Sequence, residues 1–316
     1  MRLQQGVNGS GLRALVTGGA GFIGSHLLDR LVKEGAEVAV IDNLSSGSLD
    51  NIHHRIDFLE ANVNSVEIER FVFDFRPNVV FHLAFNTNVP MSVNAPDVEM
   101  DSIAGSIRLF QALKDLRDHP IIIFASSEFI YGNAAVMPTP ESETVDPIAP
   151  YAISKFAVEN YLRFYSEAFG ISGVVLRFGT VYGPRQKMGA MSDYIAKLSS
   201  DNQAEIYGDG SKTRDYIFVS DVVEACVRCL SLGGGRYFDI YNIGTGVQTS
   251  LNSIYRMIAE HLGKSANPIY LEDRPGEQIH CLLDCRKFSE KTNWRPRIPI
   301  SEGLKMRIDD FLLSNR

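Results

Sequence analysis

The sequence predicts a doubly wound α/β fold, in which helices cover both faces of a mainly parallel sheet, with a smaller C-terminal lobe. Strand-like apolar runs alternate with helical stretches through the first 180 residues. The run I-I-I-F at residues 121–124 is apolar throughout, which is typical of a strand buried on both faces. The expected strands are residues 13–17, 37–41, 79–83, 121–125 and 173–177, and the expected helices are residues 24–33, 96–116 and 151–169.

A glycine-rich turn follows the first expected strand and precedes the first expected helix. It reads G-G-A-G-F-I-G at residues 18–24. In this position Gly18 makes the tight turn, Gly21 lets a pyrophosphate reach the N–H groups of the helix N-terminus, and Gly24 brings helix against strand. We therefore expect a Rossmann-type dinucleotide-binding domain.

Asp42 indicates which dinucleotide is bound. It lies at the end of the second expected strand, eighteen residues after Gly24, where a carboxylate can accept hydrogen bonds from both adenosine ribose hydroxyls and would repel a 2′-phosphate. NAD is therefore expected rather than NADP. The alternative is that Asp42 only caps the following turn. Two further groups are expected to line the cofactor. Asn62 and Val63 would lie beside the adenine, and Leu83, Ala84 and Phe85, at the end of the strand 79–83, would lie on the nicotinamide side.

Beyond about residue 180 the expected elements are shorter and are separated by loops, as is typical of a lobe that shapes a substrate site. We expect residues 1–180 to form the cofactor-binding domain, with residues 1–11 as a flexible tail, and residues 181–316 to form mainly the substrate-binding lobe. The strand-like run at 237–242 indicates that a segment near 218–246 returns to the first domain. The expected loops of the lobe include residues 183–184, 208–210 and 233–235.

Composition disfavours several classes of partner. The 316 residues carry 38 acidic and 31 basic side chains, a formal charge of −7, and no basic stripe that could neutralise the phosphates of a nucleic acid. No run reaches the roughly 18 to 20 apolar residues of a membrane span, and the polar start lacks the apolar centre of a signal peptide, so we expect a cytoplasmic protein. The four cysteines form the pairs 226/229 and 281/285, which we interpret as reduced thiols rather than zinc ligands.

Tyr151 and Lys155 begin an expected amphipathic helix in the segment Y-A-I-S-K. Their spacing places phenol and ammonium on one face, where the ammonium and a positive nicotinamide would lower the tyrosine pKa from about 10 towards neutrality and make a general base. The alternative is a core tyrosine and a solvated lysine. Ser127 favours the catalytic interpretation, because it follows the strand at 121–125, at the sheet edge where ligands bind.

With these residues, the chain strongly resembles the extended short-chain dehydrogenase/reductase family, particularly its UDP-glucose 4-epimerase-like nucleotide-sugar enzymes. The resemblance runs from about residue 13 to residue 311. Its ordered motifs are T-G-G-A-G-F-I-G-S-H, I-D-N-L-S-S-G, F-H-L-A, I-Y-G, P-Y-A-I-S-K, V-Y-G-P-R-Q, Y-G-D-G-S-K-T-R-D-Y, V-S-D-V, Y-N-I-G-T-G and R-P-G-E.

The resemblance implies roles for individual residues. Tyr151 and Lys155 would also bind the nicotinamide ribose, and Ser127 would lie beside the sugar hydroxyl that is oxidised. Arg214 and Arg274 would bind the diphosphate and nucleotide of the substrate, a task that suits the paired donors of a guanidinium. The helices at 96–116 and 151–169 would pair across the two-fold axis of a homodimer. The implied NAD site consists of Gly18, Gly21, Phe22, Ile23, Gly24, Asp42, Asn43 and Gly47, to which we add Phe178.

Four positions depart from the family pattern. Thr180 stands where an asparagine usually contacts the substrate diphosphate, and Ser102 also replaces an asparagine. Asn62 replaces a common aspartate near the adenine, and Phe85 replaces a small residue. None of these changes removes a catalytic group, but they leave the sugar and the nucleotide open.

Glu128 and Phe129 bear on the type of reaction. At this place the related sugar 4,6-dehydratases have a motif like S-T-D-E-V-Y-G, and the decarboxylases one like S-T-S-E-V-Y-G. The glutamate of these motifs corresponds to Phe129 in this chain, and the residue before it to Glu128. Phenylalanine cannot abstract a proton, so the sequence favours C4 epimerisation of a nucleotide-diphosphate hexose through a transient 4-keto sugar. A variant dehydratase that uses Glu128, a nucleotide-sugar dehydrogenase or reductase, and a catalytically silent NAD-binding regulator stay as alternatives.

Overall fold

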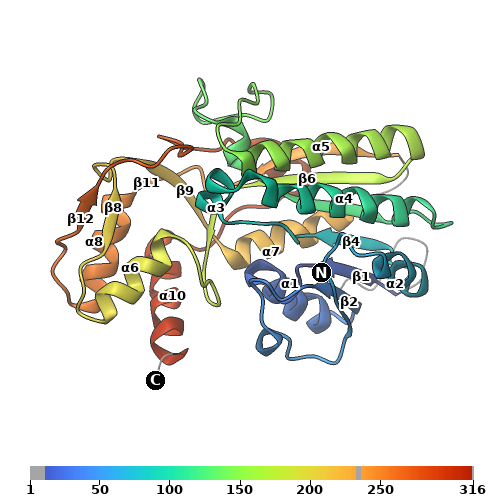
Figure 1. The fold of residues 1–316 in the computed structure, drawn as a ribbon, viewed down its shortest axis with the longest axis horizontal. Helices are drawn as coiled ribbons and strands as arrows, with labels where there is room; N and C mark the ends of the chain where they lie inside the picture. Colours follow the sequence, from blue (N-terminus) through green and yellow to red (C-terminus); the bar gives the residue numbers. More distant parts are fainter. Residues whose placement is uncertain (1–10, 233–235, 315–316) are drawn as a thin grey trace.

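The computed structural model describes residues 11–232 and 236–314. All of the expected tail except Gly11 lies outside the described residues, as does the expected loop at 233–235. Figure 1 shows two lobes, a larger one built around a sheet and a smaller one with helices at the opposite side. Those helices are α6 (Ala190–Ser199), α8 (Leu251–Leu262) and α10 (Ile300–Ser314).

Seven strands of the described chain form the large sheet. In spatial order they are β10 (Phe238–Ile243), β6 (Ser172–Phe178), β5 (Ile121–Ser127), β4 (Val79–His82), β1 (Arg13–Thr17), β2 (Glu37–Asp42) and β3 (Asp57–Glu60). Every neighbouring pair is parallel, so the expected fold class is confirmed. The last of these seven strands in chain order, β10, lies at the edge of the sheet beside β6.

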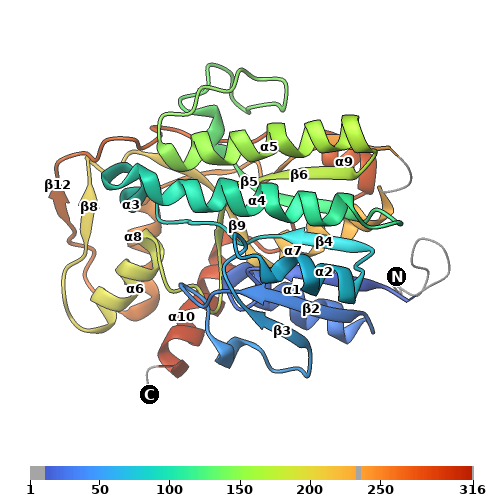
Figure 2. The same ribbon diagram turned by 45° about the vertical axis from the view of Figure 1, so that its right-hand side comes forward.

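Helices cover both faces of this sheet, and Figure 2 shows α4 and α5 lying side by side on one of them. That face carries α2 (Glu67–Phe75), α4 (Glu99–Lys114) and α5 (Pro150–Phe169), and the other carries α1 (Phe22–Lys33), α7 (Val219–Arg228) and α9 (Arg286–Thr292). Leu15 of β1 packs with the first group, whereas Val16 packs with the second. Successive strand side chains are therefore buried on opposite faces, which explains the continuous apolar runs.

Three expected elements extend further than the sequence pattern indicated. β5 continues to Ser127, so this serine ends the strand instead of following it. α5 begins at Pro150, because proline fits the first turn of a helix. α1 begins at Phe22 after Gly21, whose backbone is extended.

The smaller lobe combines short strands with the three helices named above. Its core includes Tyr194 of α6, Ile254 of α8 and Leu304 of α10, all buried. β7 (Thr180–Tyr182), β9 (Thr213–Phe218) and β11 (Gln248–Ser250) form one small sheet, and β8 (Glu205–Tyr207) pairs with β12 (Ile269–Leu271). The other elements are α3 (Val89–Asn94), η1 (Leu49–Asn51), η2 (Pro96–Val98), η3 (Glu128–Tyr131) and η4 (Cys229–Ser231).

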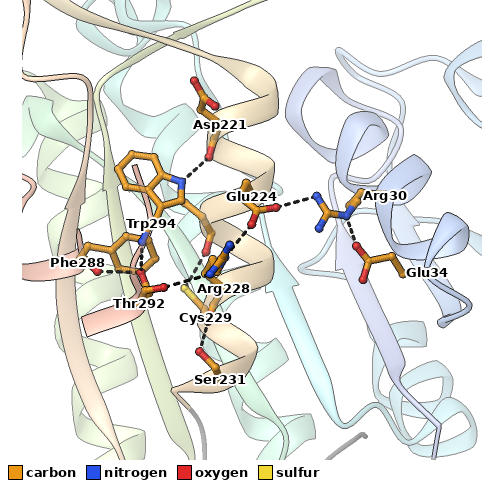
Figure 3. Close-up of polar contacts among 11 residues, drawn as sticks. Arg30, Glu34, Asp221, Glu224, Arg228, Cys229, Ser231, Phe288, Thr292 and Trp294 are labelled. Atoms are coloured by element: carbon orange, nitrogen blue, oxygen red, sulfur yellow. Dashed lines mark hydrogen bonds and ion pairs between the residues drawn. The ribbon is translucent and has the colours of Figure 1, made fainter. Parts of the chain in front are cut away.

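The helix α7 joins α1 to the segment that leads into α10, as Figure 3 shows. Glu224 of α7 lies 2.8 Å from Arg30 of α1 and 2.7 Å from Arg228 of its own helix. On the other side, the buried Trp294 donates its indole N–H to the carbonyl of Asp221 at 3.0 Å. The chain after residue 284 thus packs against the large sheet before it returns to the smaller lobe.

Within the ranges 11–232 and 236–314, no helix is both long enough and apolar enough to cross a membrane.

Candidate active site

The glycine turn after β1 forms a cradle that only small residues can make. Gly18 has a φ of +73°, and a Cβ on it would lie 2.8 Å from the backbone nitrogen of Ala84. A Cβ on Gly24 would lie 2.1 Å from the carbonyl oxygen of Gly18. Glycine is therefore required at Gly18 by backbone conformation and close approach, and at Gly24 by close approach.

The N-terminus of α1 opens onto this cradle. Gly21 is its N-cap and provides no side-chain cap, and the first turn contains no acidic residue. Phe22 and Ile23 are the first two residues of the helix, so their N–H groups belong to the unpaired first turn. Such a helix end favours an anion through its N–H groups and its dipole. The arrangement fits the pyrophosphate of a dinucleotide.

Asp42 is buried at the end of β2, next to the glycine turn. One carboxylate oxygen accepts from the backbone N–H of Ala20 at 2.9 Å, and the other from that of Leu44 at 2.8 Å. Asp42 thus caps the following turn, as the alternative interpretation expected, and its two oxygens keep further acceptor sites for ribose hydroxyls. Asn43 and Gly47 lie in the next loop, which packs so closely that a Cβ on Gly47 would be 2.8 Å from Ala20.

The ends of β3 and β4 lie beside the same cradle. After β4, the backbone N–H groups of Leu83 and Ala84 donate to the backbone and to the side chain of Thr17, at 3.1 and 3.2 Å. After β3, Asn62 accepts from the N–H of Asn64 at 2.8 Å. Val63 is buried against the α4 helix. These contacts fix the loops in which the expected cofactor-binding residues lie.

Tyr151, Lys155 and Ser127 come together at the carboxyl end of β5, and all three are buried. Ser127 and Tyr151 are linked by a side-chain hydrogen bond. Ser127 is paired in register with Phe178 of β6. The Lys155 ammonium donates to the carbonyl of Ala125 at 2.6 Å. The sequence placed the three candidate catalytic residues at one sheet edge, and the structure brings them together there.

The electrostatics of Tyr151 are set mainly by its burial. Burial raises its pKa well above the usual value, the hydrogen bond from Ser127 opposes this rise, and the charges of Glu128 and Glu99 add to it. The Lys155 ammonium lies 3.8 Å from the centre of the Phe85 ring but 5.8 Å from that of Tyr151. In the protein alone, burial thus raises the tyrosine pKa, and the lowering expected with a positive nicotinamide beside it stays a prediction.

Burial also changes the ionisation of Lys155. It lowers the lysine pKa to about 7, against the opposing effect of the Glu99 and Glu159 carboxylates. Desolvation of the charged form is the cause of this change. The protonation state of the ammonium consequently depends on which carboxylates stay charged nearby.

Glu128, Thr180 and Arg214 form a second group beside the tyrosine. The Thr180 hydroxyl donates to Glu128 at 3.1 Å. Burial raises the pKa of Glu128 to about 7, although Arg214 and Thr180 lower it. The Arg214 guanidinium lies 5.7 Å from the centre of the Phe129 ring, which meets the Tyr151 ring edge-to-face with centres 6.2 Å apart.

Arg274 is placed apart from this group. Its guanidinium lies 3.2 Å from the centre of the Tyr207 ring of β8, in the smaller lobe. Among the contacts of the described residues, none joins Arg274 to Glu128, Thr180 or Arg214. Of the four expected substrate-binding residues, the structure therefore places Ser127, Thr180 and Arg214 in the region around Glu128 and Tyr151. The fourth, Arg274, packs on Tyr207 instead.

A buried polar network beneath the site was missed from the sequence. Arg177 of β6 and Glu159 of α5 form a buried ion pair of 2.7 Å. Ser126 also donates to Glu159, and Arg177 donates to the Tyr131 hydroxyl at 2.8 Å. Glu159 is four residues beyond Lys155, so the helical spacing that linked Tyr151 to Lys155 could have found it.

Glu99 and Asn86 were missed as well. Glu99 is a buried carboxylate of α4, and Asn86 donates to it at 2.7 Å. The helix carries Glu99, Ser102 and Ser106 at spacings of three and four residues, which places these polar groups on one face. A polar stripe at helical spacing was the available signal.

The cysteines have no arrangement typical of a metal centre. Cys226 and Cys229 are buried within or directly after α7, and burial raises the pKa of the Cys226 thiol to about 12. In the part of the chain that the structure describes, no group of three or more histidine, cysteine or acidic side chains is placed to hold a metal ion.

The fold and the glycine cradle define a dinucleotide-binding α/β enzyme, and comparison with known proteins specifies its family. Residues 14–244 match the NAD-dependent epimerase/dehydratase family. The chain belongs to this family, and it is an NAD-dependent enzyme.

Individual relatives align along nearly the whole chain. UDP-glucose 4-epimerase of Mycolicibacterium smegmatis is 35% identical over 95% of this chain and 98% of its own length. The structure of UDP-glucose 4-epimerase from Thermotoga maritima with UDP-glucose has a TM-score of 0.90 and 36% identity, over 96% of this chain and 99% of that one. The structure of UDP-glucuronic acid 4-epimerase from Bacillus cereus, in complex with UDP-glucuronic acid and NAD, has a TM-score of 0.89 and 29% identity, over 95% of this chain and 99% of that one.

Proposed function

We propose that this protein is a nucleotide-sugar epimerase that interconverts the C4 epimers of a nucleotide-diphosphate hexose through a transient 4-keto sugar. The observation that carries the proposal is the packing around Tyr151. Phe129 meets the tyrosine edge-to-face with ring centres 6.2 Å apart, at the position where the related dehydratases have an acid. The tyrosine, Ser127 and Lys155 are all present, so oxidation and re-reduction lose no group.

The bound NAD would accept a hydride from C4 of the sugar and return it to the opposite face. The pyrophosphate would lie at the N-terminus of α1 and the adenosine ribose at Asp42. We propose that the cofactor contacts Gly18, Gly21, Phe22, Ile23, Gly24, Asp42, Asn43, Gly47, Asn62, Val63, Leu83, Ala84, Phe85, Tyr151, Lys155 and Phe178.

The side chains at the end of β5 would manage the proton. As the 4-hydroxyl is oxidised, its proton passes to the phenolate of Tyr151, and the same proton returns when the ketone is reduced. Ser127 would hydrogen-bond this sugar oxygen, as it does the tyrosine here. The high pKa of Tyr151 in the protein alone means that nearby positive charge is needed to form the phenolate. Lys155 and the bound cofactor supply that charge.

Arginine side chains would bind the substrate phosphates and nucleotide. Arg214 is buried next to Glu128 and Phe129, close to the catalytic tyrosine. Arg274 lies in the smaller lobe on Tyr207, and a planar guanidinium and ring are suited to a nucleotide base or its phosphates. The relatives named above include enzymes whose structures hold UDP-sugars, so UDP-hexoses are the first substrates to test.

A variant dehydratase is the second candidate, and Glu128 favours it. This carboxyl group is buried beside Tyr151, and its pKa of about 7 suits a general acid or base at neutral pH. Glu128 also accepts a hydrogen bond from Thr180 and interacts with Arg214. These contacts are equally consistent with a role in positioning these two substrate-binding residues.

Product analysis decides between these functions. The purified protein is incubated with UDP-, GDP-, CDP- and dTDP-hexoses, and the products are separated while absorbance at 340 nm is recorded. We expect one pair of C4 epimers to reach equilibrium without net absorbance change. A 4-keto-6-deoxy product would support the dehydratase instead, and a steady change at 340 nm would support a dehydrogenase or reductase. Cofactor binding without turnover of any sugar would support a silent regulator.

We also propose that the enzyme is a cytoplasmic homodimer in which the domain 1–180 binds the cofactor and residues 181–316 mainly form the substrate-binding lobe, with a segment near 218–246 shared with the first domain. Large apolar side chains on the outer surface of α5 support the dimer. Ile153, Tyr161 and Phe164 are 53%, 41% and 54% exposed, and such a surface is suited to packing against its own copy. Light scattering at micromolar concentration should give the mass of a dimer, and a monomer would contradict it.

A further inference from the structure

Gln278 is a buried residue in the segment that follows Arg274, and its side chain contacts the turn η3 next to the candidate catalytic residues. Only 1% of the residue is exposed. The side-chain nitrogen donates to the carbonyl of Glu128 at 3.2 Å and to that of Gly132 at 2.6 Å. These carbonyls belong to the first residue of η3 and to the residue directly after it. One side chain therefore holds both ends of the turn.

The chemistry of these contacts requires a donor at position 278. Both partners are carbonyl oxygens, which only accept, so the amide must direct its NH₂ group to them. The side-chain oxygen of Gln278 is buried and has no hydrogen-bond partner among the described residues, and such an unpaired atom is costly. An apolar side chain would fill this space without that cost. What the glutamine adds is therefore the pair of N–H donors.

The turn that Gln278 holds carries groups that lie against Tyr151. Ser127 is the N-cap of η3, where its hydroxyl accepts from the backbone N–H of Phe129 at 3.3 Å. The same serine is hydrogen-bonded to Tyr151. The Phe129 ring meets the Tyr151 ring edge-to-face with centres 6.2 Å apart. A displacement of η3 would therefore move both the serine hydroxyl and the ring that contact the tyrosine.

The segment around Gln278 is itself fixed to the start of β9 in the smaller lobe. The backbone N–H of Thr213 donates to the carbonyl of Ile279 at 3.1 Å, and that of Cys281 donates to the carbonyl of Thr213 at 3.2 Å. The backbone N–H of Ile279 also donates to the Asn133 side chain at 2.9 Å, just beyond η3. Gln278 thus joins a fixed part of the smaller lobe to the turn.

We propose that Gln278 is a positioning residue, which holds η3 so that Ser127 and Phe129 keep their places against Tyr151. This inference rests on the proposed function for its catalytic meaning, because Ser127 is expected to hydrogen-bond the sugar oxygen that reacts. Misplacement of a reacting group by about 1 Å can lower the rate by about 10²-fold. The placement of the turn can be measured without a sugar, and its effect on the reaction can be measured separately.

Nuclear magnetic resonance of Tyr151 tests the placement of the turn. The protein is labelled with ¹³C-tyrosine, and the Tyr151 ring signal is assigned with Tyr151→Phe. Gln278→Met keeps the length of the side chain and removes its donors, so the Tyr151 signal should shift as the Phe129 ring moves. The signals of Tyr194 and Tyr255, in the core of the smaller lobe, should stay in place. An unchanged Tyr151 signal in folded Gln278→Met would overturn the proposal.

Gln203→Met is the matched control. Gln203 also donates its amide to a backbone carbonyl, that of Asn267 at 3.0 Å, but it is exposed and lies in the smaller lobe. This substitution should leave the Tyr151 signal unchanged. A shift of equal size in Gln203→Met would assign the effect to general loosening of the protein and overturn the proposal.

Gln278→Glu keeps the test decisive if Gln278→Met does not fold. A protonated carboxyl can donate to one of the two carbonyls, whereas an ionised one only accepts and is repelled by them. The difference in the Tyr151 signal between Gln278→Glu and wild type should therefore grow as pH rises. Wild type is measured at each pH, because Glu128 also acts on Tyr151. A difference that does not change with pH would overturn the proposal.

The activity arm separates this inference from the proposed function. With rates expressed per molecule of bound cofactor, kcat for epimerisation by Gln278→Met should fall by about 10- to 100-fold, and kcat of Gln278→Glu should recover towards wild type as pH falls. A merely structural role would reduce the amount of folded enzyme and leave this kcat unchanged, which would overturn the proposal. If wild type epimerises no sugar while the Tyr151 signal still shifts in Gln278→Met, the proposed function fails and the positioning of η3 stands.

Discussion

Arg177 and Glu159 are joined by a buried ion pair next to the candidate catalytic segment, with guanidinium and carboxylate 2.7 Å apart and both side chains at most 3% exposed. Glu159 also accepts from Ser126, the residue before Ser127, and lies one helical turn beyond Lys155. The pair therefore connects β5, β6 and α5 at the point where the three candidate catalytic side chains meet.

Removing one partner of this pair should destabilise the protein strongly. Glu159→Gln leaves the Arg177 charge buried without its counter-charge, and breaking a buried pair in this way costs about 3–5 kcal/mol. Urea unfolding followed by circular dichroism measures the change. Asp74→Asn is the control, because its ion pair with Arg70 is 3.5 Å long and largely exposed, and such pairs contribute about 0–1 kcal/mol. Equal destabilisation by the two variants would contradict this account.

Asp42 should determine the preference for NAD over NADP. Asp42→Asn removes the charge that repels a 2′-phosphate, and its single amide oxygen can accept from only one of the N–H groups of Ala20 and Leu44, which bind separate carboxylate oxygens in wild type. Hydrogen bonds to charged groups contribute about 1.5–3 kcal/mol, so NADH affinity should fall by about tenfold or more while NADPH affinity rises. Fluorescence titration of both cofactors measures this, with the exposed Asp50→Asn as control. Tighter binding of NADPH than NADH by wild type would reject the assignment of Asp42.

Much of this site could be predicted from the sequence because it depends on local order. The glycine turn, Asp42 and the Tyr151 to Lys155 spacing each follow from a strand end or a helix start, and parallel strands bring their carboxyl ends to one edge. The direction of the Lys155 ammonium could not be predicted, because it depends on Phe85 in the loop after β4 and on Ala125 of β5. Arg274 on Tyr207 likewise depends on how the segments of the smaller lobe pack.

The burial of Glu128 should appear as a pH dependence of stability. Its pKa is raised from 4.5 to about 7, so the folded protein holds this proton more tightly than the unfolded chain. The stability that this proton confers is fully present below pH 4.5 and is lost as pH rises through about 7. Glu128→Gln cannot ionise, so its Tm relative to wild type should rise between pH 4.5 and pH 8. The exposed Glu260→Gln is the control, and a Tm difference independent of pH would contradict the raised pKa.

The chemistry of the site is tested by comparing substitutions of Tyr151, Ser127 and Glu128. Tyr151→Phe should keep the fold and NAD binding while turnover falls by about 10²-fold or more, because loss of a positioned acid/base group costs roughly 10² to 10⁴. Ser127→Ala should act in the same direction with a smaller effect, since it removes a hydrogen bond and not the proton acceptor. Initial rates with saturating NAD measure both, and turnover unaffected by Tyr151→Phe would reject the catalytic assignment.

Glu128→Gln then distinguishes the two candidate reactions, because it keeps the shape of the side chain and removes its proton-transfer capacity. In an epimerase neither hydride step needs this carboxylate, so interconversion of C4 epimers should persist, with any loss confined to the effect of Thr180 and Arg214 on substrate binding. In a dehydratase the 4-keto-6-deoxy product should disappear, since Phe129 cannot take over as the base and Glu128 is the acid that the segment 126–132 contains. Product analysis of wild type and Glu128→Gln side by side reads out the difference. A KM that rises while kcat is kept would assign Glu128 to the substrate pocket, whereas a kcat that collapses would assign it to the chemistry.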